Sequence, residues 1–318
     1  MLPDNRWYGH RKILLQYLGL KDRAIFASLQ HGWCSQVLDK TENYKKNYFY
    51  RILVWSKFQS KFFLKKKINN VYDIGSPFLY LCKILETNQS KQRNNLKKDK
   101  KILVFPAHSS QGFNHITNHK LLIKNVKKSF KGHYTVCFYY FDLNKKDIDL
   151  YKKNKWDVIC CVKNKTDQLS LYKLYNQINN HDIIVSTEFS SALFYSMYLK
   201  KKTRVMLSPN KRLEFYSNIE RKFLKFYMDN YPELFKKFLS SEKGYKLAKL
   251  ELGFKSMKNK HDLKEILGLN SFLKIILSYI FSFIYDLKYG SSLREGKKLS
   301  NKKLKKYISA ARKKSGLY

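Results

Sequence analysis

The sequence predicts an α/β protein with two Rossmann-like lobes, whose parallel sheets face a common cleft, followed by C-terminal helices. After Lys101, short apolar runs alternate with stretches of helical periodicity, which indicates βαβ units and a parallel sheet. A smaller version of this alternation precedes residue 86. Between the two, residues 86–100 are polar and nearly free of apolar side chains, as is typical of a linker.

We therefore expect a short first lobe at 1–85, the linker at 86–100 and a second lobe at 101–210. Residues 211–270 are expected to form a helical region, and 271–318 an apolar helix with a basic tail. The chain has 318 residues, of which 44% are hydrophobic, so it can bury a core of real size.

The elements of the first lobe follow from local patterns. Helices are expected at WYGHRKILLQYLG and FQSKFFLKKKI, and strands at AIFASLQ, YRILVWS and NVYDIGSP. Each strand is a short apolar run that ends in polar residues, Gly or Pro, which is how a buried strand of a parallel sheet terminates.

The second lobe has longer and clearer patterns. Strands are expected at KILVFPAH, HYTVCFYYFD, KWDVICCVK, HDIIVSTE and TRVMLSP. Helices are expected before Ser129, near 143–153, near 168–179 and at FSSALFYSMYLKKK. Because strands and helices alternate throughout, this lobe supports the predicted fold class most strongly.

The formal net charge of +40 suggests an anionic partner, either nucleic acid or a membrane surface. Lysines are spread along the whole chain among many Asn, Ile, Tyr and Phe residues, which is the bias of an AT-rich genome. No nucleic-acid motif is present, and most aromatic residues lie in apolar runs typical of a core. We therefore expect no specific nucleic-acid partner, and a non-enzymatic protein that binds nucleic acid or other anions remains an alternative.

Cysteine usage and the absence of long apolar runs indicate a cytoplasmic protein. The five cysteines have no CxxC spacing and favour reduced thiols in the core. The N-terminus has no apolar run of the kind found in signal peptides, and no run reaches the length of a membrane span.

One segment near the C-terminus resembles a membrane-surface helix. Residues Phe272 to Tyr285 are mostly apolar, and a lysine-rich tail follows them. This pattern fits a helix that lies on an anionic leaflet, which would make the protein peripheral at the inner face of the cytoplasmic membrane. A buried C-terminal core helix with a solvated tail explains the pattern equally well.

Polar residues follow several predicted strands directly. His31 and Gly32 follow AIFASLQ in the first lobe. Further candidates for the cleft are Gly75, Ser76 and Pro77 in the first lobe, and His108, Ser109, Ser110, Thr187 and Glu188 in the second. Ligands of open parallel sheets bind beyond the carboxyl ends of the strands, so these residues are expected to face one cleft.

The stretch from Asp182 to Val205 has the most specific pattern. A strand ends in a polar turn, and Ser190 and Ser191 then open a helix. Hydroxyls and N–H groups at a helix N-terminus can bind phosphate. Simple N-capping by one of the serines is the alternative.

The loop PAHSSQG is rich in hydrogen-bond donors and contains His108, Ser109 and Ser110. We expect it to contact phosphate or a sugar hydroxyl. A metal site formed with His115 and His119 is an alternative, but no acidic or cysteine ligand lies nearby in sequence, so no metal is expected.

Three turns resemble those of known transferases. The stretch Asp182–Val205 is similar to a strand-turn-helix of CDP-glycerol glycerophosphotransferases, with Glu188 where that family has aspartate. The turn QHGW looks like one that the same family and some capsule transferases carry after a first-lobe strand, and Gly75–Pro77 is similar to a Gly-x-Pro turn of GT-B enzymes. The chain thus resembles GT-B-fold transferases of bacterial surface polysaccharides, such as capsule and lipopolysaccharide glycosyltransferases.

This resemblance implies a transfer from a nucleotide-sugar donor to a lipid-linked or polysaccharide acceptor, without a cofactor. It places His31 on the acceptor side as general base or charge stabiliser. His108 would neutralise the leaving phosphate, and Ser190 and Ser191 would hold the donor phosphates. Glu188 would contact the nucleotide ribose or base, and the absence of an Asp-x-Asp motif agrees with metal-independent chemistry. Transfer of an alditol phosphate from a CDP-alcohol on the same fold is the alternative activity.

Overall fold

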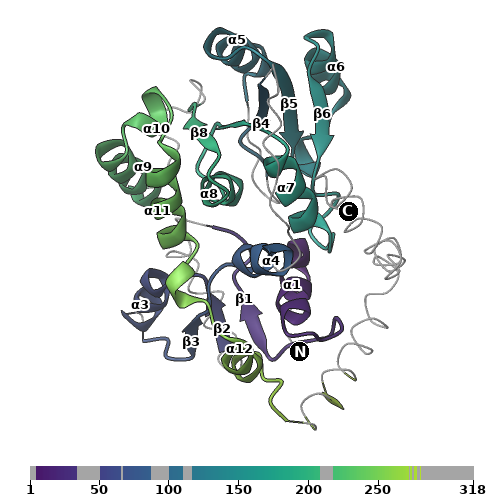
Figure 1. Ribbon diagram of the computed structural model, residues 1–318, viewed down its shortest axis with the longest axis vertical. Helices are drawn as coiled ribbons and strands as arrows, with labels where there is room; N and C mark the ends of the chain where they lie inside the picture. Colours follow the sequence, from purple (N-terminus) through teal and green to yellow (C-terminus); the bar gives the residue numbers. More distant parts are fainter. Residues whose placement is uncertain are drawn as a thin grey trace.

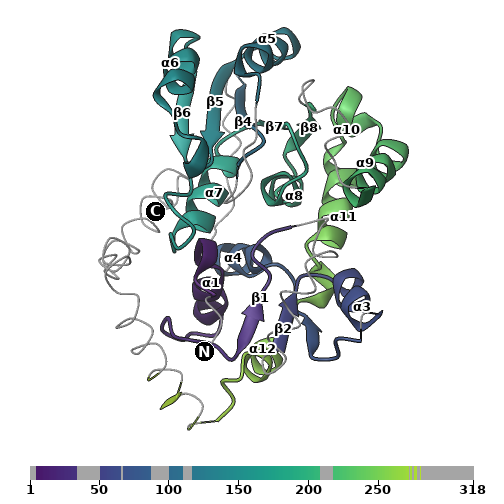
Figure 2. The same cartoon turned by 180° about the vertical axis from the view of Figure 1, so that it is seen from behind.

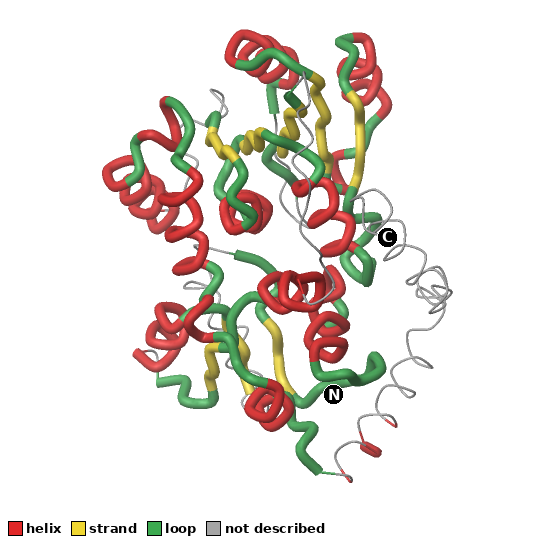
Figure 3. The backbone as a smooth tube through the Cα atoms, in the orientation of Figure 1, coloured by secondary structure: helices red, strands yellow, loops and turns green. Residues whose placement is uncertain are grey.

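A computed structural model describes residues 5–33, 51–65, 67–86, 100–109, 117–207 and 218–271, with Leu273, Ile276, Leu277 and Ile280 beyond them. It contains two parallel sheets, one of three strands and one of five, in separate lobes (Figure 1). The predicted α/β class with two Rossmann-like lobes is therefore confirmed. Figure 3 shows each sheet surrounded by helices, with no described strand crossing from one lobe to the other.

The first lobe has the strand order β1-β2-β3, and all pairs are parallel. Its strands are β1 (Ala27–Leu29), β2 (Arg51–Val54) and β3 (Val71–Asp73), and its helices are η1 (Trp7–Gly9), α1 (His10–Tyr17), α3 (Lys57–Lys65) and α4 (Pro77–Glu86). Strand β1 is shorter than the predicted apolar run, because the Phe26 N–H donates to the Leu267 carbonyl (3.1 Å) and not to a strand.

The second lobe has the strand order β6-β5-β4-β7-β8, again fully parallel. Its strands are β4 (Lys101–Phe105), β5 (His133–Phe138), β6 (Asp157–Cys160), β7 (Ile183–Ser186) and β8 (Lys202–Val205). Its helices are α5 (His119–Ser129), η2 (Tyr140–Asp142), α6 (Lys145–Lys153), α7 (Ser170–Asn179) and α8 (Ser191–Tyr198). The strand order reverses between β4 and β7, and ligands of doubly wound sheets bind at such a switch point.

Helices of both lobes meet between the two sheets and form one hydrophobic core. Helices α1 and α4 of the first lobe lie below α7 and α8 of the second in Figures 1 and 2. The ring of Phe78 in α4 stacks on that of Tyr195 in α8, with centroids 4.0 Å apart. Both rings are fully buried, and the core around them extends from Leu29 in the first sheet to Leu103 in the second.

The C-terminal helices contact both lobes in turn. They are α9 (Asn218–Asn230), α10 (Glu233–Lys236), α11 (Ser241–Glu251), η4 (Phe254–Ser256) and α12 (Lys260–Ile266). Helix α11 packs on α8, and the chain then returns to the first lobe, where the Arg51 guanidinium donates to the Glu265 carbonyl.

The segment that returns to the first lobe packs tightly against it at Gly253. Gly253 has a positive φ of +70°, and a Cβ there would overlap the Trp55 carbonyl oxygen. That oxygen also accepts from the Gly75 N–H (2.9 Å), and the Ser76 N–H donates to the Leu252 carbonyl (2.8 Å). Only glycine fits both the backbone conformation and the space.

We predict that Gly253→Ala lowers the free energy of unfolding by about 3 kcal/mol, because backbone strain and overlap with Trp55 add together. Gly19→Ala is the matched control, since Gly19 also has a positive φ (+76°) but no atom within 4 Å of its added Cβ. It should cost only about 1 kcal/mol. Urea unfolding measures both, and equal losses would contradict the role of the contact.

Candidate functional site

The loops after β4 and β7 are held together at the carboxyl edge of the second sheet. The Ala107 N–H donates to Thr187 Oγ1 (2.6 Å), and the Thr187 N–H donates to the Phe105 carbonyl (3.0 Å). Thr187 is buried. These bonds fix the two loops at the switch point, where a ligand of this fold is expected.

His108 is the half-exposed side chain of this edge. Its backbone N–H donates to Glu188 Oε1 (3.3 Å), and its Nε2 lies 4.0 Å from the same oxygen. Its Nδ1 lies 3.0 Å from the Ser109 carbonyl oxygen, and its ring centroid is 4.6 Å from that of Tyr139. The half-exposed imidazole can therefore contact a ligand that binds at this edge.

Ser109 contributes its backbone to a neighbouring loop. The Ser109 N–H donates to both carboxylate oxygens of Asp142, at 3.1 and 3.0 Å, and the residue is buried. Asp142 follows β5, so this contact joins the β4 and β5 loops. Ser110 lies outside the described residues, and its predicted role stays a prediction.

His31 follows β1 and is exposed, as expected of a side chain at the cleft. Its ring stacks on Trp7, with centroids 4.1 Å apart and planes inclined by 17°. The Lys165 ammonium lies 5.2 Å from the Trp7 ring, so a cation of the second lobe also contacts this indole. His31 is therefore positioned by the first lobe and lies beside a loop of the second.

The start of α8 meets the turn that contains His31 and Gly32. The Trp33 N–H donates to Ser191 Oγ (2.8 Å), and a Cβ at Gly32 would lie 3.5 Å from that oxygen. Ser190 Oγ is buried and has no hydrogen-bond partner among the described residues. Of the two predicted serines, Ser191 thus joins the lobes, whereas Ser190 retains an uncommitted hydroxyl.

A buried carboxylate fixes the same turn from the other side. The Trp33 indole Nε1–H donates to Glu251 Oε2 (2.7 Å), and the Tyr227 hydroxyl donates to Glu251 Oε1 (2.6 Å). Burial raises the pKa of Glu251 above its usual value. Sequence patterns gave no sign of this contact, because its three residues are far apart in the chain.

Gly75, Ser76 and Pro77 do not form an open rim. Ser76 is fully buried and Pro77 is buried, and the Ser76 hydroxyl accepts from the Phe78 N–H (3.3 Å) at the start of α4. The end of α11 covers the turn through Leu252. This arrangement favours a structural role for the turn.

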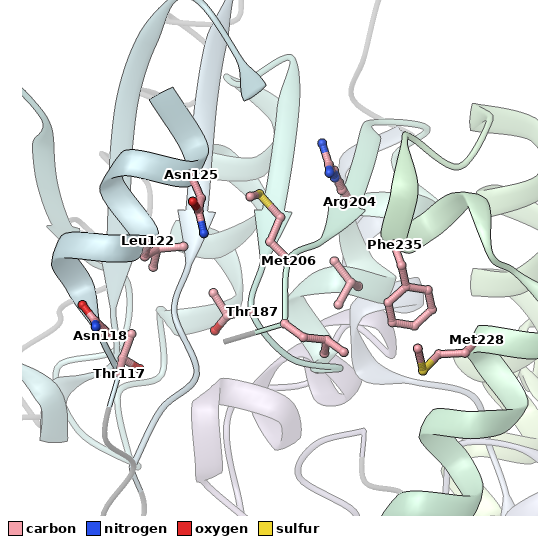
Figure 4. Close-up of a pocket in the computed structure, with 11 residues that line it drawn as sticks. Thr117, Asn118, Leu122, Asn125, Thr187, Arg204, Met206, Met228 and Phe235 are labelled. Atoms are coloured by element: carbon pink, nitrogen blue, oxygen red, sulfur yellow. The ribbon is translucent and has the colours of Figure 1, made fainter. Parts of the chain in front are cut away.

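A pocket of about 260 Å³ adjoins Thr187 (Figure 4). Its walls are Thr117, Asn118, Leu122, Asn125, Thr187, Arg204, Val205, Met206, Leu207, Met228 and Phe235. Nε of Arg204 is buried without a hydrogen-bond partner among the described residues. The guanidinium and the two amides favour an anionic or polar ligand, and the apolar walls favour a partly apolar one.

The described residues contain no group of three or more His, Cys, Asp or Glu side chains that could bind a metal. His119 faces α6, where its Nδ1 lies 3.0 Å from the Tyr151 hydroxyl and its Nε2 lies 3.6 Å from Asp147 Oδ2. His115, the third ligand of the alternative metal site, lies outside the described residues.

Sequence analysis missed several side chains that contact the candidate histidines. Trp7 and Tyr8 lie in a stretch predicted as helix, and Tyr139 in a run predicted as strand. The signal available for Tyr139 was the aromatic run Tyr139-Tyr140-Phe141 after β5, whose last ring is half-exposed.

His10 is a buried histidine at the start of α1. Its Nδ1 has no partner among the described residues, and its other nitrogen bonds the Gln30 backbone. Burial, together with a smaller effect of the nearby His31, lowers the pKa of His10 to about 3. His10 is thus neutral in the folded protein at ordinary pH.

Comparison with known proteins gives only distant structural likenesses. No known family matches the sequence, and no curated protein matches it. The UDP-GlcNAc 2-epimerase of Neisseria meningitidis bound to UDP-GlcNAc is 15% identical, with a TM-score of 0.37, over 71% of this chain and 66% of that one. MnaA of S. aureus with UDP is 13% identical, with a TM-score of 0.38, over 77% and 67%.

A mutant of S. aureus TarM in complex with fondaparinux, alpha-GlcNAc-glycerol and UDP is 16% identical, with a TM-score of 0.32. The match covers 79% of this chain and half (50%) of TarM. The chain therefore spans about two thirds or less of the proteins it resembles. All three likenesses are too weak to assign an activity to this chain.

We predict that the stability of the protein falls as pH decreases from about 6.5 towards about 3, because unfolded His10 binds a proton that the folded residue excludes. In His10→Gln, the slope of the free energy of unfolding against pH should be smaller by about 1.4 kcal/mol per pH unit between about pH 4 and about pH 6. Urea unfolding at several pH values measures the slope. His261→Gln, an exposed histidine, is the control, and an unchanged slope in His10→Gln would refute the assignment.

Proposed function

We propose that the protein is a GT-B-type glycosyltransferase that moves a sugar from a nucleotide-sugar donor to a lipid-linked or polysaccharide acceptor in cell-surface polysaccharide synthesis. One observation carries the proposal. Strand ends of two parallel sheets present a histidine from each lobe, His31 and His108, near the start of α8.

Sugar transfer needs a base that takes the proton of the acceptor hydroxyl. It also needs positively charged groups or N–H donors held in place at the leaving phosphate. In the proposed reaction, the acceptor hydroxyl gives its proton to His31 as its oxygen bonds to the anomeric carbon. The bond from that carbon to the donor phosphate breaks, and the nucleotide leaves with the electron pair. His108 and the N–H groups at the start of α8 stabilise its charge.

The contacts favour Ser190 over Ser191 as the phosphate ligand. Ser191 Oγ already accepts from the Trp33 N–H, whereas Ser190 Oγ is uncommitted among the described residues. Glu188 lies beside His108 and is suited to a ribose hydroxyl. The pocket beside Thr187 adds Arg204, whose charge favours an anionic nucleotide.

Transfer of an alditol phosphate from a CDP-alcohol remains the second candidate. The similarity of Asp182–Val205 to CDP-glycerol glycerophosphotransferases favours it. Both reactions need a nucleotide phosphate site and a base, so the identity of the bound nucleotide and donor distinguishes them.

A lipid-linked acceptor would place the protein at the inner face of the membrane, and exposed apolar side chains support this part of the proposal. Leu273, Ile276 and Ile280 are 66%, 39% and 47% exposed. Their i, i+3, i+7 spacing puts them on one face of a helix, and a basic tail follows in sequence. No described helix could cross a bilayer.

We predict that one of CMP, CDP, UDP, GDP and ADP raises the melting temperature of the protein. A ligand at a hundred times its Kd stabilises the native state by about 2.7 kcal/mol, or several degrees for a chain of this size. Ser190→Ala and His108→Ala should each lose most of this shift. Ser129→Ala is the control, since Ser129 is exposed at the end of α5 and belongs to none of the candidate contacts.

If none of the five nucleotides shifts the melting temperature, while single-stranded nucleic acid does, the transferase proposal is wrong. The charge of +40 would then be the functional feature. A shift that persists in both variants would place the nucleotide elsewhere on the protein.

We predict that the full chain sediments with vesicles containing phosphatidylglycerol and that truncation after Leu269 weakens this binding. Replacing Leu273, Ile276 and Ile280 together by Ser should weaken it at least about tenfold, because apolar burial is lost while the basic tail is kept. Leu250→Ser, at a 67% exposed leucine of α11, is the control. Unchanged binding in the truncated chain would exclude this membrane contact.

A further inference from the structure

The N-terminal turn η1 has an unusual backbone at Tyr8. Tyr8 has φ 54° and ψ 16°, in the left-handed region that non-glycine residues rarely adopt. Its N–H donates to the Lys165 carbonyl of the second lobe (2.9 Å), and its hydroxyl lies 2.7 Å from that of Tyr139. Such conformations persist where surrounding contacts hold them, and they are concentrated at functional sites.

Gly9 continues the left-handed turn and brings it against the second lobe. It has φ +79°, and a Cβ there would overlap the Gln168 carbonyl oxygen. Any residue larger than glycine at this position would force the turn away from the loop between β6 and α7.

On its other side, the turn is attached to strand β1. The Asn5 side chain donates to the Ala27 carbonyl (2.6 Å) and accepts from the Leu29 N–H (2.8 Å). These bonds place the turn in register with β1, the strand that precedes His31. Asn5 thus joins the residues before the turn to the first lobe, whereas the backbone of Tyr8 and Gly9 and the Tyr8 hydroxyl contact the second lobe.

Adjacent residues of this turn contact the surroundings of both candidate histidines. Trp7 stacks directly on His31, with ring centroids 4.1 Å apart. Tyr8 hydrogen-bonds Tyr139, whose ring centroid lies 4.6 Å from that of His108. One short segment therefore connects a histidine of the first lobe with a histidine of the second.

We propose that the turn Trp7–Gly9 sets the positions of the two histidines relative to each other, with Trp7 and the Tyr8–Tyr139 hydroxyl pair as positioning residues. The reaction ascribed to the histidines rests on the proposed function, but their positioning does not. An acid and a base on separate lobes must be held at a fixed separation to act on one substrate. The turn supplies that constraint through Trp7 at His31 and through the Tyr8–Tyr139 bond beside His108.

The test measures how fast diethyl pyrocarbonate modifies each histidine, by mass spectrometry of digested protein. We expect Tyr8→Phe and Tyr139→Phe each to raise the rate at His108 by about threefold to tenfold, the effect of losing one hydrogen bond. The double variant should match the single ones, because both remove the same bond. Trp7→Phe should raise the rate at His31.

Tyr172→Phe is the matched control. The Tyr172 hydroxyl also bonds across the lobes, to Gln16 Oε1 (2.6 Å), but it is not part of the set of contacts around the histidines. The rate at the exposed His261 should stay constant in all variants and serves as the internal standard.

Equal His108 rates in wild type, Tyr8→Phe and Tyr139→Phe would overturn the proposal. An equal rise in Tyr172→Phe would also overturn it, because general loosening of the lobes would then explain the effect. Nucleotide-induced melting shifts, measured on the same variants, separate the two proposals. A wild type that binds no nucleotide defeats the transferase assignment, while the modification rates still decide the positioning role.

Discussion

The stacking of Phe78 on Tyr195 is the interaction on which the rest of the structure depends. It joins α4 to α8 in a buried hydrophobic core, so the two sheets are held by packing that resists changes in separation. The Tyr195 hydroxyl bonds the side chains of Ser76 and Ser191, and Ser191 in turn accepts from Trp33. The hydrophobic contact is therefore linked through Tyr195 to the turn that follows β1 and to the start of α8.

The positions of His31 and His108 could be predicted from sequence because they depend on local pattern. Each follows a short apolar strand, and parallel strands of one sheet end at one edge. The same reasoning located Thr187 and Glu188 after β7. The same reasoning was insufficient for Gly75–Pro77, which follow β3. A strand end is open to a ligand only if no other element covers it, and the end of α11 covers the end of β3.

The contacts that orient the histidines could not be predicted, because they join segments distant in sequence. The Tyr8–Tyr139 and Trp33–Glu251 bonds leave no periodic signal, and the aromatic residues involved look like ordinary core residues. Ser190 and Ser191 were indistinguishable as a tandem pair. The two hydroxyls differ because the Trp33 N–H of the first lobe donates a hydrogen bond to Ser191 Oγ.

The return of α12 to the first lobe has a consequence for synthesis on the ribosome. The Phe26 N–H bonds the Leu267 carbonyl, and Gly268 packs on the Phe26 side chain, so the first lobe is incomplete until these late residues emerge. All five strands of the second lobe lie within residues 101–205, and the helices α10 and α11 that pack on it end at Glu251, before Leu267 and Gly268. Long-range contacts form slowly. The half of the protein that is made first is thus the half that is finished last.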